Sequence, residues 1–567
     1  MDKHQRRLFS PARLLPVVGV VFAIGLGFLW ASGPAQTPDP ATLSPPGVLP
    51  ITEQPLHLDG FIPSAGFIAD IQTNAAMLRV SQRTNVHVDW IEAHKLGAHE
   101  QLTLLLSGES YPGIIQGASG SGLSMEQIVA YGADGIFLPL NRLIDEHAPN
   151  IRDMFDAIPG LRAMITAPDG NIYGLPAVFT DDYHMTLRHK LWLNQDWLDR
   201  LGLATPTTTD EFYEVLLAFR DRDANGNGDP NDEIPLTGAR RNLEDVFMWI
   251  MNAFVPAGGQ DESGDPTLNA YEYIIDGTVF FSANRPEFRE GLRYIRRLYE
   301  ENLISINSFT QDRRQIRSLV DGGSVTRLGG VASHHPGNFA QIGDDAELRF
   351  RQYRALPPIA GPDGTGHTPW YSDVLLEQGQ FVITDAVSDP VVAIRLADYY
   401  YSREFAEIDK GIEGVHWRRV DAGENLRAIG GGVAEYEYLR TLVPEDNAQL
   451  NLGPVWTRDL KTRFAMTEEF SYEQMLHEAT IPYDPYRVQL YPYRRISIPS
   501  GSVDEFNDLR RTIHAYIGDS VDRFVIGDLD IDRDWDEYVL HLNRLGLPRY
   551  LELLYSAYVR LDRRSGL

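Results

Sequence analysis

The chain has 567 residues, of which 43% are apolar and 23% are charged, so two large lobes fit its length and global disorder does not fit its composition. Its formal net charge of −28 argues against nucleic acid or an anionic membrane surface as the main partner, since both would be repelled. The absence of cysteine excludes disulfides, thiolate metal sites, a cysteine nucleophile and lipid attachment through cysteine.

The N-terminal residues 1–35 are predicted to be a signal peptide or an N-terminal membrane anchor. Basic residues precede an apolar run over residues 14–30, and small residues follow it up to Ala35. This order is typical of an export signal, and cleavage after Ala35 is predicted, with an uncleaved anchor as the alternative. Residues 36–50 are rich in proline, which predicts an extended linker in front of the folded body.

Strands and helices are predicted to alternate from residue 51 onwards. The patterns predict strands at 57–62, 86–91 and 111–115, helices at 65–83 and 99–107, and a further helix opening at 137–140. This strand–helix–strand spacing indicates βαβ units and a mainly parallel sheet. The chain beyond residue 504 is predicted to be helical, and its last helix should bury one face made of Leu551, Leu554, Tyr555 and Tyr558.

An acidic loop over residues 223–233 carries a metal-binding signal. Oxygen side chains alternate with small residues, and two glycines allow a tight curl. Calcium prefers six to eight oxygen ligands, so the loop predicts a structural Ca²⁺ site, with a solvated turn as the alternative. The spacing in the second half of the loop departs from a regular EF-hand. The later acids Asp232 and Glu233 can close the coordination shell.

Several segments in order resemble a known family. Residues 191–203 (LWLNQDWLDRLGL) precede Pro206-Thr207-Thr208 and the acidic loop, and residues 135–141 (GIFLPLN) and 411–417 (GIEGVHW) also match. From about residue 51 to the C-terminus the chain resembles the extracellular solute-binding proteins of ABC sugar importers. The similarity is to the large subgroup that includes lipoprotein-type and alginate-binding proteins.

The resemblance implies an α/β fold of two lobes with the ligand in the cleft between them. The expected N-terminal lobe is 51–180 with about 325–405, and the expected C-terminal lobe is about 181–324 with 406–567. The family also implies a carbohydrate ligand, and permease subunits of the importer as partners. It further implies calcium at the acidic loop, and the residues that match the family's ligands are Asp223, Asn225, Asn227, Asp232 and Glu233, with Asp229 contributing through its backbone carbonyl. Because no cysteine is available for lipid attachment, a periplasmic location is expected. The protein is also expected to be a monomer.

Aromatic side chains in predicted loops are the candidate sugar-binding residues, because sugars stack on flat rings. The candidates are Trp249, Trp370, Tyr371 and Trp417, each with core packing as the alternative. The adjacent His334 and His335 lack a third metal ligand and are expected in a surface or packed loop. The residues leave two other functions open: a secreted glycan-active enzyme, which would need a carboxylate pair, and a membrane-anchored sugar sensor.

Overall fold

The computed structural model divides the chain into two units, Met1–Pro38 and Asp39–Leu567. The predicted signal segment and the first part of the linker lie outside the described residues. Within the described part of the chain, no helix is long and apolar enough to cross a membrane. The structure describes residues 43–64, 68–94, 97–108, 110–180, 183–240, 244–258, 270–370, 375–450, 453–466, 472–492, 498 and 500–565.

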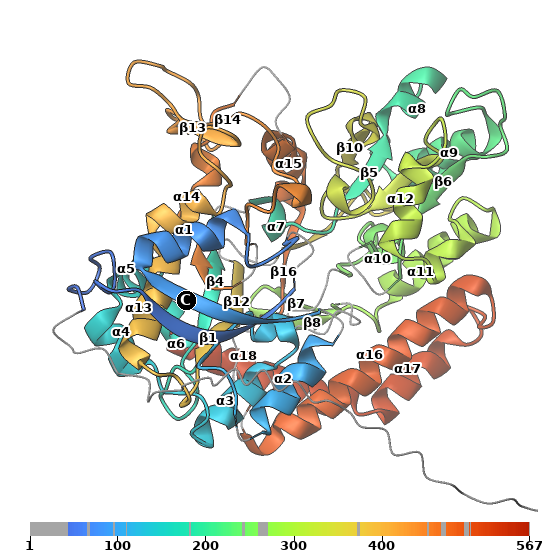
Figure 1. Ribbon diagram of the computed structural model, residues 1–567. Coiled ribbons are helices and arrows are strands. Elements are labelled where there is room, and N and C mark those ends of the chain that lie inside the picture. Colours follow the sequence, from blue (N-terminus) through green and yellow to red (C-terminus); the bar gives the residue numbers. More distant parts are fainter. Residues whose placement is uncertain are drawn as a thin grey trace, which may run out of the picture. The chain divides into compact units, whose positions relative to one another are not determined.

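A six-stranded sheet contains the first strands of the folded body (Figure 1). Its order is β15 (Val455–Trp456), β4 (Leu175–Phe179), β12 (Leu375–Ile383), β3 (Ile114–Gln116), β1 (Leu56–Pro63) and β2 (Val86–Ala93). Strand β1 pairs in parallel with both β2 and β3, as the βαβ prediction requires. Strand β12 inserts between β3 and β4 and runs antiparallel to both, so the sheet is mixed.

Helices cover this sheet and form its core. They are α1 (Ala75–Thr84), α2 (Ala98–Leu106), α3 (Met125–Ala133), α4 (Asn141–His147), α5 (Pro149–Ala157), α6 (Leu161–Met164), α13 (Pro390–Tyr400) and α14 (Arg403–Ile408). Helix α1 begins later than the predicted residue 65, because the Asn74 side chain accepts hydrogen bonds from the backbone N–H groups of Ala76 and Met77 and caps the helix there. Between β1 and β3 the predicted elements are confirmed.

A second group of elements surrounds a four-stranded sheet. The strands are, in order, β10 (Tyr353–Leu356), β5 (Leu191–Asn194), β9 (Leu328–Ala332) and β6 (Ile234–Thr237). The helices are α8 (Gln195–Leu201), α9 (Thr209–Asp221), α10 (Val246–Met251), α11 (Pro286–Glu300) and α12 (Arg313–Asp321). A large apolar cluster joins α8, α9, α10 and α11 to the C-terminal helices α16 (Val503–Ile526), α17 (Trp535–Arg544) and α18 (Leu547–Ser565), whereas α12 packs in a separate cluster.

Two smaller sheets complete the fold. One has the order β11 (Thr368–Trp370), β16 (Arg487–Leu490), β7 (Glu272–Ile275) and β8 (Thr278–Phe281). The other pairs β13 (Trp417–Arg419) with β14 (Tyr436–Tyr438). Helices α7 (Tyr183–Thr186) and α15 (Tyr472–Thr480) lie in contact with each other.

Sheet membership does not follow the lobe ranges expected from the sequence. Strands β9 and β10, expected in the N-terminal lobe, pair with β5 and β6. Strand β15, expected in the C-terminal lobe, pairs with β4. The sequence pattern identifies the elements, but it carries no signal for which of two sheets a late strand joins.

Two local expectations are corrected. Residues 43–50 are not a free linker, because the Arg395 guanidinium on α13 donates hydrogen bonds to the backbone oxygens of Ser44, Pro45 and Val48 at 2.5–3.2 Å. In α18, Tyr555 is 52% exposed, whereas Leu554 is fully buried. The buried face of this helix therefore runs through Tyr550, Leu553, Leu554 and Ala557, and Tyr555 points away from it.

Candidate functional site

Among the described elements, three passages of the chain connect the six-stranded sheet to the two four-stranded sheets, and two of them include residues 371–374 and 467–471, which lie outside the described residues. The first passage leads from β4 through α7 to β5, and the second leads from β11 to β12. The third leads from β15 to α15, whose Tyr472 and Leu476 pack in the apolar cluster of the four-stranded sheet. Side chains on these passages lie where both groups of elements can reach them, so a ligand bound there could contact both groups.

A small open pocket lies among these passages. Its lining comes from α7, from the segment between β13 and β14, from residues that follow β15, and from α15. The lining residues are Tyr183, His184, Ile429, Lys461, Thr462, Glu473 and His477. The Lys461 ammonium lies 3.2 Å from the Glu473 carboxylate, and the Tyr183 ring packs against His477 with centroids 5.1 Å apart. The pocket thus combines aromatic, cationic and acidic groups, as a polar ligand with apolar faces requires.

A row of side chains leads from this pocket to one of the predicted aromatic residues. Burial, followed by the charge and hydrogen bond of Asp484, raises the pKa of Tyr183 to about 12, so its hydroxyl is a donor at neutral pH. The Asp484 carboxylate lies 3.3 Å from Nε of Arg487, and the Arg487 guanidinium lies 5.0 Å from the Trp370 ring centroid. We call Tyr183, Asp484, Arg487 and Trp370 the passage row.

Strand β11 presents buried polar atoms along one face at the end of the passage row. Trp370 is half-buried, and its indole Nε1 is buried without a hydrogen-bond partner. The Thr368 hydroxyl, two residues earlier and so on the same face of the strand, has no partner either. Unsatisfied buried polar atoms are costly, and a ligand with many hydroxyl groups would satisfy both.

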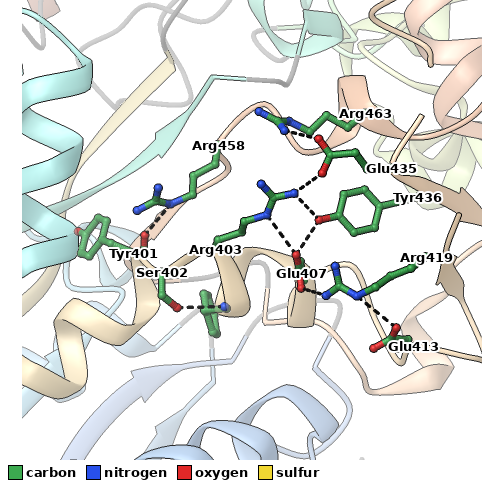
Figure 2. A network of polar contacts seen from close by, with 11 residues as sticks. Tyr401, Ser402, Arg403, Glu407, Glu413, Arg419, Glu435, Tyr436, Arg458 and Arg463 are labelled. Carbon is green, nitrogen blue, oxygen red and sulfur yellow. Dashed lines mark hydrogen bonds and ion pairs between the residues drawn. The ribbon is translucent and has the colours of Figure 1, made fainter. Parts of the chain in front are cut away.

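The pocket wall from residues 429–462 is held by an ionic network around the buried Glu407 and Tyr436, whose arginine partners are partly exposed (Figure 2). Glu407 on α14 accepts a hydrogen bond from the Tyr436 hydroxyl at 2.6 Å, and it is ion-paired with Arg403 and Arg419. Glu435 links Arg403 to Arg463 in the same network. Because these residues connect α14 to β13, β14 and the segment that carries Lys461 and Thr462, they fix that wall against the six-stranded sheet.

The four predicted sugar-binding aromatics are not brought together. Trp249 is 4% exposed and packs against Phe212 with ring centroids 5.9 Å apart. Trp417 is 3% exposed, and its Nε1 donates to the Gly411 carbonyl at 3.0 Å. Both side chains therefore pack in the core, which was the alternative to sugar binding for these two residues. Trp370 keeps a partly exposed ring, and Tyr371 lies outside the described residues.

The passage row and the pocket were not predicted, apart from Trp370. Their residues come from segments far apart in the chain, and no spacing in the sequence marks them. His334 and His335 pack as a T-shaped pair with ring centroids 4.2 Å apart, in agreement with a packed loop.

The acidic loop folds as a tight coil of side-chain and backbone contacts. The Asn225 and Asn227 amides donate to the two carboxylate oxygens of Asp232 at 2.7 and 2.9 Å. The Asp229 side chain accepts a hydrogen bond from the Asn231 backbone at 3.1 Å and faces outward. Gly226 has a φ of +76°, which a glycine adopts without strain.

Two carboxylate oxygens of this loop are buried without a hydrogen-bond donor: Oδ1 of Asp223 and Oε2 of Glu233. Burial, opposed by hydrogen bonds from the backbone and assisted by the charges of Asp232 and Asp223, raises the pKa of Glu233. Buried, mutually repelling carboxylates are the environment that a cation relieves. The described residues nevertheless contain no group of three or more His, Asp or Glu side chains already arranged around a metal position.

The fold and the three passages are those of a solute-binding protein with two α/β lobes. No family model matches the chain. It is 27% identical over 498 residues to the fructooligosaccharide ABC transporter substrate-binding protein FusA of Streptococcus pneumoniae, covering 85% of this chain and 86% of that protein. The relatives and structural neighbours are substrate-binding proteins of sugar ABC transporters, so the resemblance is confirmed.

Solved structures show the same fold. FusA of S. pneumoniae in complex with kestose superposes with a TM-score of 0.71 at 24% identity, over 90% of this chain and all of that one. An EF-hand mutant of FusA with fructo-nystose gives a TM-score of 0.72 at 24% identity, with the same coverage. The alginate-binding protein AlgQ2 without calcium ion gives 0.63 at 22% identity, over 89% of this chain and 98% of that one.

Proposed function

We propose that this protein captures an oligosaccharide outside the cytoplasmic membrane and delivers it to the permease of an ABC importer. The observation that carries the proposal is the similarity to FusA over 85% of the chain, together with a pocket on the passages between the two groups of elements. Substrate-binding proteins bind their ligands without converting them, so no turnover is expected. Export by the segment 1–35 is part of the proposal.

The passage row is proposed as the sugar-binding surface. The half-buried Trp370 ring offers a face for a sugar ring, and its Nε1 and the Thr368 hydroxyl offer unused hydrogen-bonding capacity. Movement of one lobe against the other around the three passages would enclose the ligand and create the surface that the permease recognises.

Isothermal titration calorimetry with the purified protein tests this function. The ligands are kestose, nystose and trigalacturonate, each also incubated with the protein to check for cleavage. Binding without cleavage is expected for at least one of them. Trp370→Ala should weaken that binding at least tenfold, whereas Tyr555→Ala, which removes an exposed aromatic ring from α18, should not. If no saccharide binds, or if any is cleaved, the proposed function is wrong.

Calcium is proposed to bind the acidic loop as a structural ion. Asp223 and Glu233 would supply their buried oxygens, Asn225, Asn227 and Asp232 would turn their oxygens inward, and Asp229 would contribute at the rim. A divalent cation supplies the positive charge that these carboxylates lack. Binding to the folded state alone stabilises that state by mass action.

Calcium titration after chelation tests this loop. We expect one bound Ca²⁺ by calorimetry and a higher midpoint of thermal unfolding with calcium than with chelator. Glu233→Gln should abolish both effects, while Asp196→Asn on α8, an exposed acid outside the loop, should preserve both. A chelator-independent midpoint together with no calorimetric heat would show that the loop is an ordinary turn.

A further inference from the structure

We propose that Asp344 and Thr441 form a clasp that holds the second group of elements against the six-stranded sheet and its helices, and that the pocket opens when this clasp breaks. The inference rests on the proposed function, which requires one lobe to move against the other, and it adds the contact that resists this movement. Both residues lie outside the three passages, so the clasp can break without any change in the path of the chain.

The clasp consists of hydrogen bonds from one residue to one carboxylate. The Thr441 backbone N–H donates to both carboxylate oxygens of Asp344 at 3.0 Å, and the Thr441 hydroxyl donates to Oδ1 at 2.6 Å. A hydrogen bond to Asp446, together with the charges of Asp446 and Asp344, raises the pKa of Arg440 against the effect of burial. The Arg440 guanidinium therefore lies close enough to feel the charge of Asp344. Hydrogen bonds to an ionised acceptor are shorter and stronger than those between neutral groups.

The Asp344 side of the clasp belongs to the second group of elements. Its loop lies between β9 and β10, and the Arg351 guanidinium donates to the Asp344 carbonyl oxygen at 2.8 Å. Ile342 and Leu348 of the same loop pack against the apolar cluster of the four-stranded sheet, which also contains residues of α15. The loop is therefore attached to the four-stranded sheet and to α15.

The Thr441 side of the clasp is attached to α1, which packs against β2 of the six-stranded sheet. The Asn447 side-chain amide donates to the Asp70 carbonyl oxygen at 2.9 Å, just before α1. The Asn447 carbonyl oxygen accepts a hydrogen bond from the backbone N–H of Ala75, the first residue of α1, at 2.9 Å. The two ends of the clasp are thus each held by their own group of elements.

The clasp joins the two bodies that line the pocket. The pocket wall, which the Glu407 network ties to α14, contributes Lys461 and Thr462, and α15 contributes Glu473 and His477. The Lys461–Glu473 ion pair, at 3.2 Å, connects these two sides inside the pocket, and the clasp connects the same two bodies outside it. Separation of the clasped residues therefore moves the two sides of the pocket apart.

A contact of this size can control the position of the lobes. Conformations that exchange in solution differ little in free energy, so the loss of a few hydrogen bonds changes their ratio several-fold. An exposed ion pair between two long side chains contributes little, because both chains must be ordered. The clasp differs from such a pair, since its donors are a backbone N–H and a short hydroxyl side chain, and both belong to Thr441.

Pulsed EPR distance measurement on the ligand-free protein tests the clasp. The chain contains no cysteine, so nitroxide labels attach only at the introduced substitutions Leu78→Cys on α1 and Ile306→Cys near β6. The two native side chains are 47% and 66% exposed, so labels fit there without disturbing the core. We expect one population at the separation that the structure gives and a second population at a longer distance.

Substitutions at the clasp should change the ratio of the two populations. Asp344→Ala should lower the ratio of the short to the long distance at least fivefold. Thr441→Val removes the hydroxyl and keeps the backbone N–H, so it should lower the ratio less. The double variant Asp344→Ala/Thr441→Val should match Asp344→Ala, because the hydroxyl has already lost its acceptor. Glu347→Ala, which removes another exposed acid from the same loop, should leave the ratio unchanged.

Three results would overturn the inference. They are an Asp344→Ala ratio equal to that of Glu347→Ala, a single population that no substitution changes, and a double variant with a clearly lower ratio than Asp344→Ala alone. The measurement contains no saccharide, so its failure would leave the proposed function standing. Failure of every saccharide to bind in calorimetry would refute the proposed function and leave the measured distances as they are.

Discussion

Lys190 offers a sharp test of the electrostatics at the first passage. Its side chain is fully buried, its ammonium lies 5.7 Å from the Tyr483 ring centroid, and its donors are used on backbone carbonyls. Burial, assisted by the charge of Arg188, lowers the pKa of Lys190 from 10.5 to about 7. Replacing Lys190 with methionine, which has a similar length and no charge, removes this titration.

The sign and size of the effect of Lys190 on the pH dependence of stability follow from proton linkage. Between pH 7 and 10.5 the unfolded chain keeps a proton on this lysine and the folded protein releases it, so stability rises with pH. The penalty of charging the buried amine is absent above pH 10.5 and fully developed below pH 7. From pH 7.5 to 9.5 this one group should add roughly 2–3 kcal/mol to the free energy of unfolding of the wild-type protein relative to Lys190→Met.

Urea denaturation at pH 7.5, 8.5 and 9.5 measures this difference. The free energy of unfolding is taken from the midpoint and slope for wild type, Lys190→Met and Lys410→Met, a partly exposed lysine that serves as the control. The difference in free energy of unfolding between wild type and Lys190→Met should change with pH. The difference between wild type and the Lys410→Met control should not. Parallel pH profiles for all three proteins would refute a neutral buried lysine.

Three further substitutions probe the framework. Arg240→Met removes the guanidinium that bridges Asp245 and Asp522 and should cost about 3–5 kcal/mol in urea denaturation; a loss under 1 kcal/mol would show that this buried pair is not stabilising. Glu407→Ala breaks the network in Figure 2, so proteolysis within residues 410–466 should accelerate, and an unchanged cleavage rate would contradict the proposed support. Gly60→Ala places a Cβ 2.6 Å from the Trp90 ring on β2 and should lower the free energy of unfolding by roughly 1–3 kcal/mol, as measured by thermal unfolding. An unchanged free energy would show that β2 can shift away from the new methyl group without cost.

The sequence predicted the elements whose pattern is local. Strands β1 and β2 show an alternating sequence pattern and flank a short amphipathic helix in the chain. Their parallel pairing follows from the right-handed βαβ connection. The position of β12 could not be read in this way. It follows the second passage and pairs with β3 and β4, which lie much earlier in the chain. Pairing between segments so far apart produces no periodic pattern in the sequence.

The candidate site was harder to predict than the fold. Tryptophan content pointed equally to Trp249 and Trp370, yet Trp249 fills the core beside Phe212 and Trp370 stands at the end of β11. Lys461 and Arg487 lie in segments without a motif, and their relation to Tyr183 exists only in three dimensions. The acidic loop was visible because all its oxygen groups lie within eleven consecutive residues.

The insertion of β12 between β3 and β4 sets an order of events during synthesis. A nascent chain that has not reached residue 375 holds β2, β1 and β3 on one side and β4 on the other, with no strand to join them. The edge strand β15 arrives later still, at Val455–Trp456. The apolar faces of the earliest strands therefore stay uncovered until most of the polypeptide has been synthesised, and this delay would serve the export that we propose, for which the chain must stay unfolded.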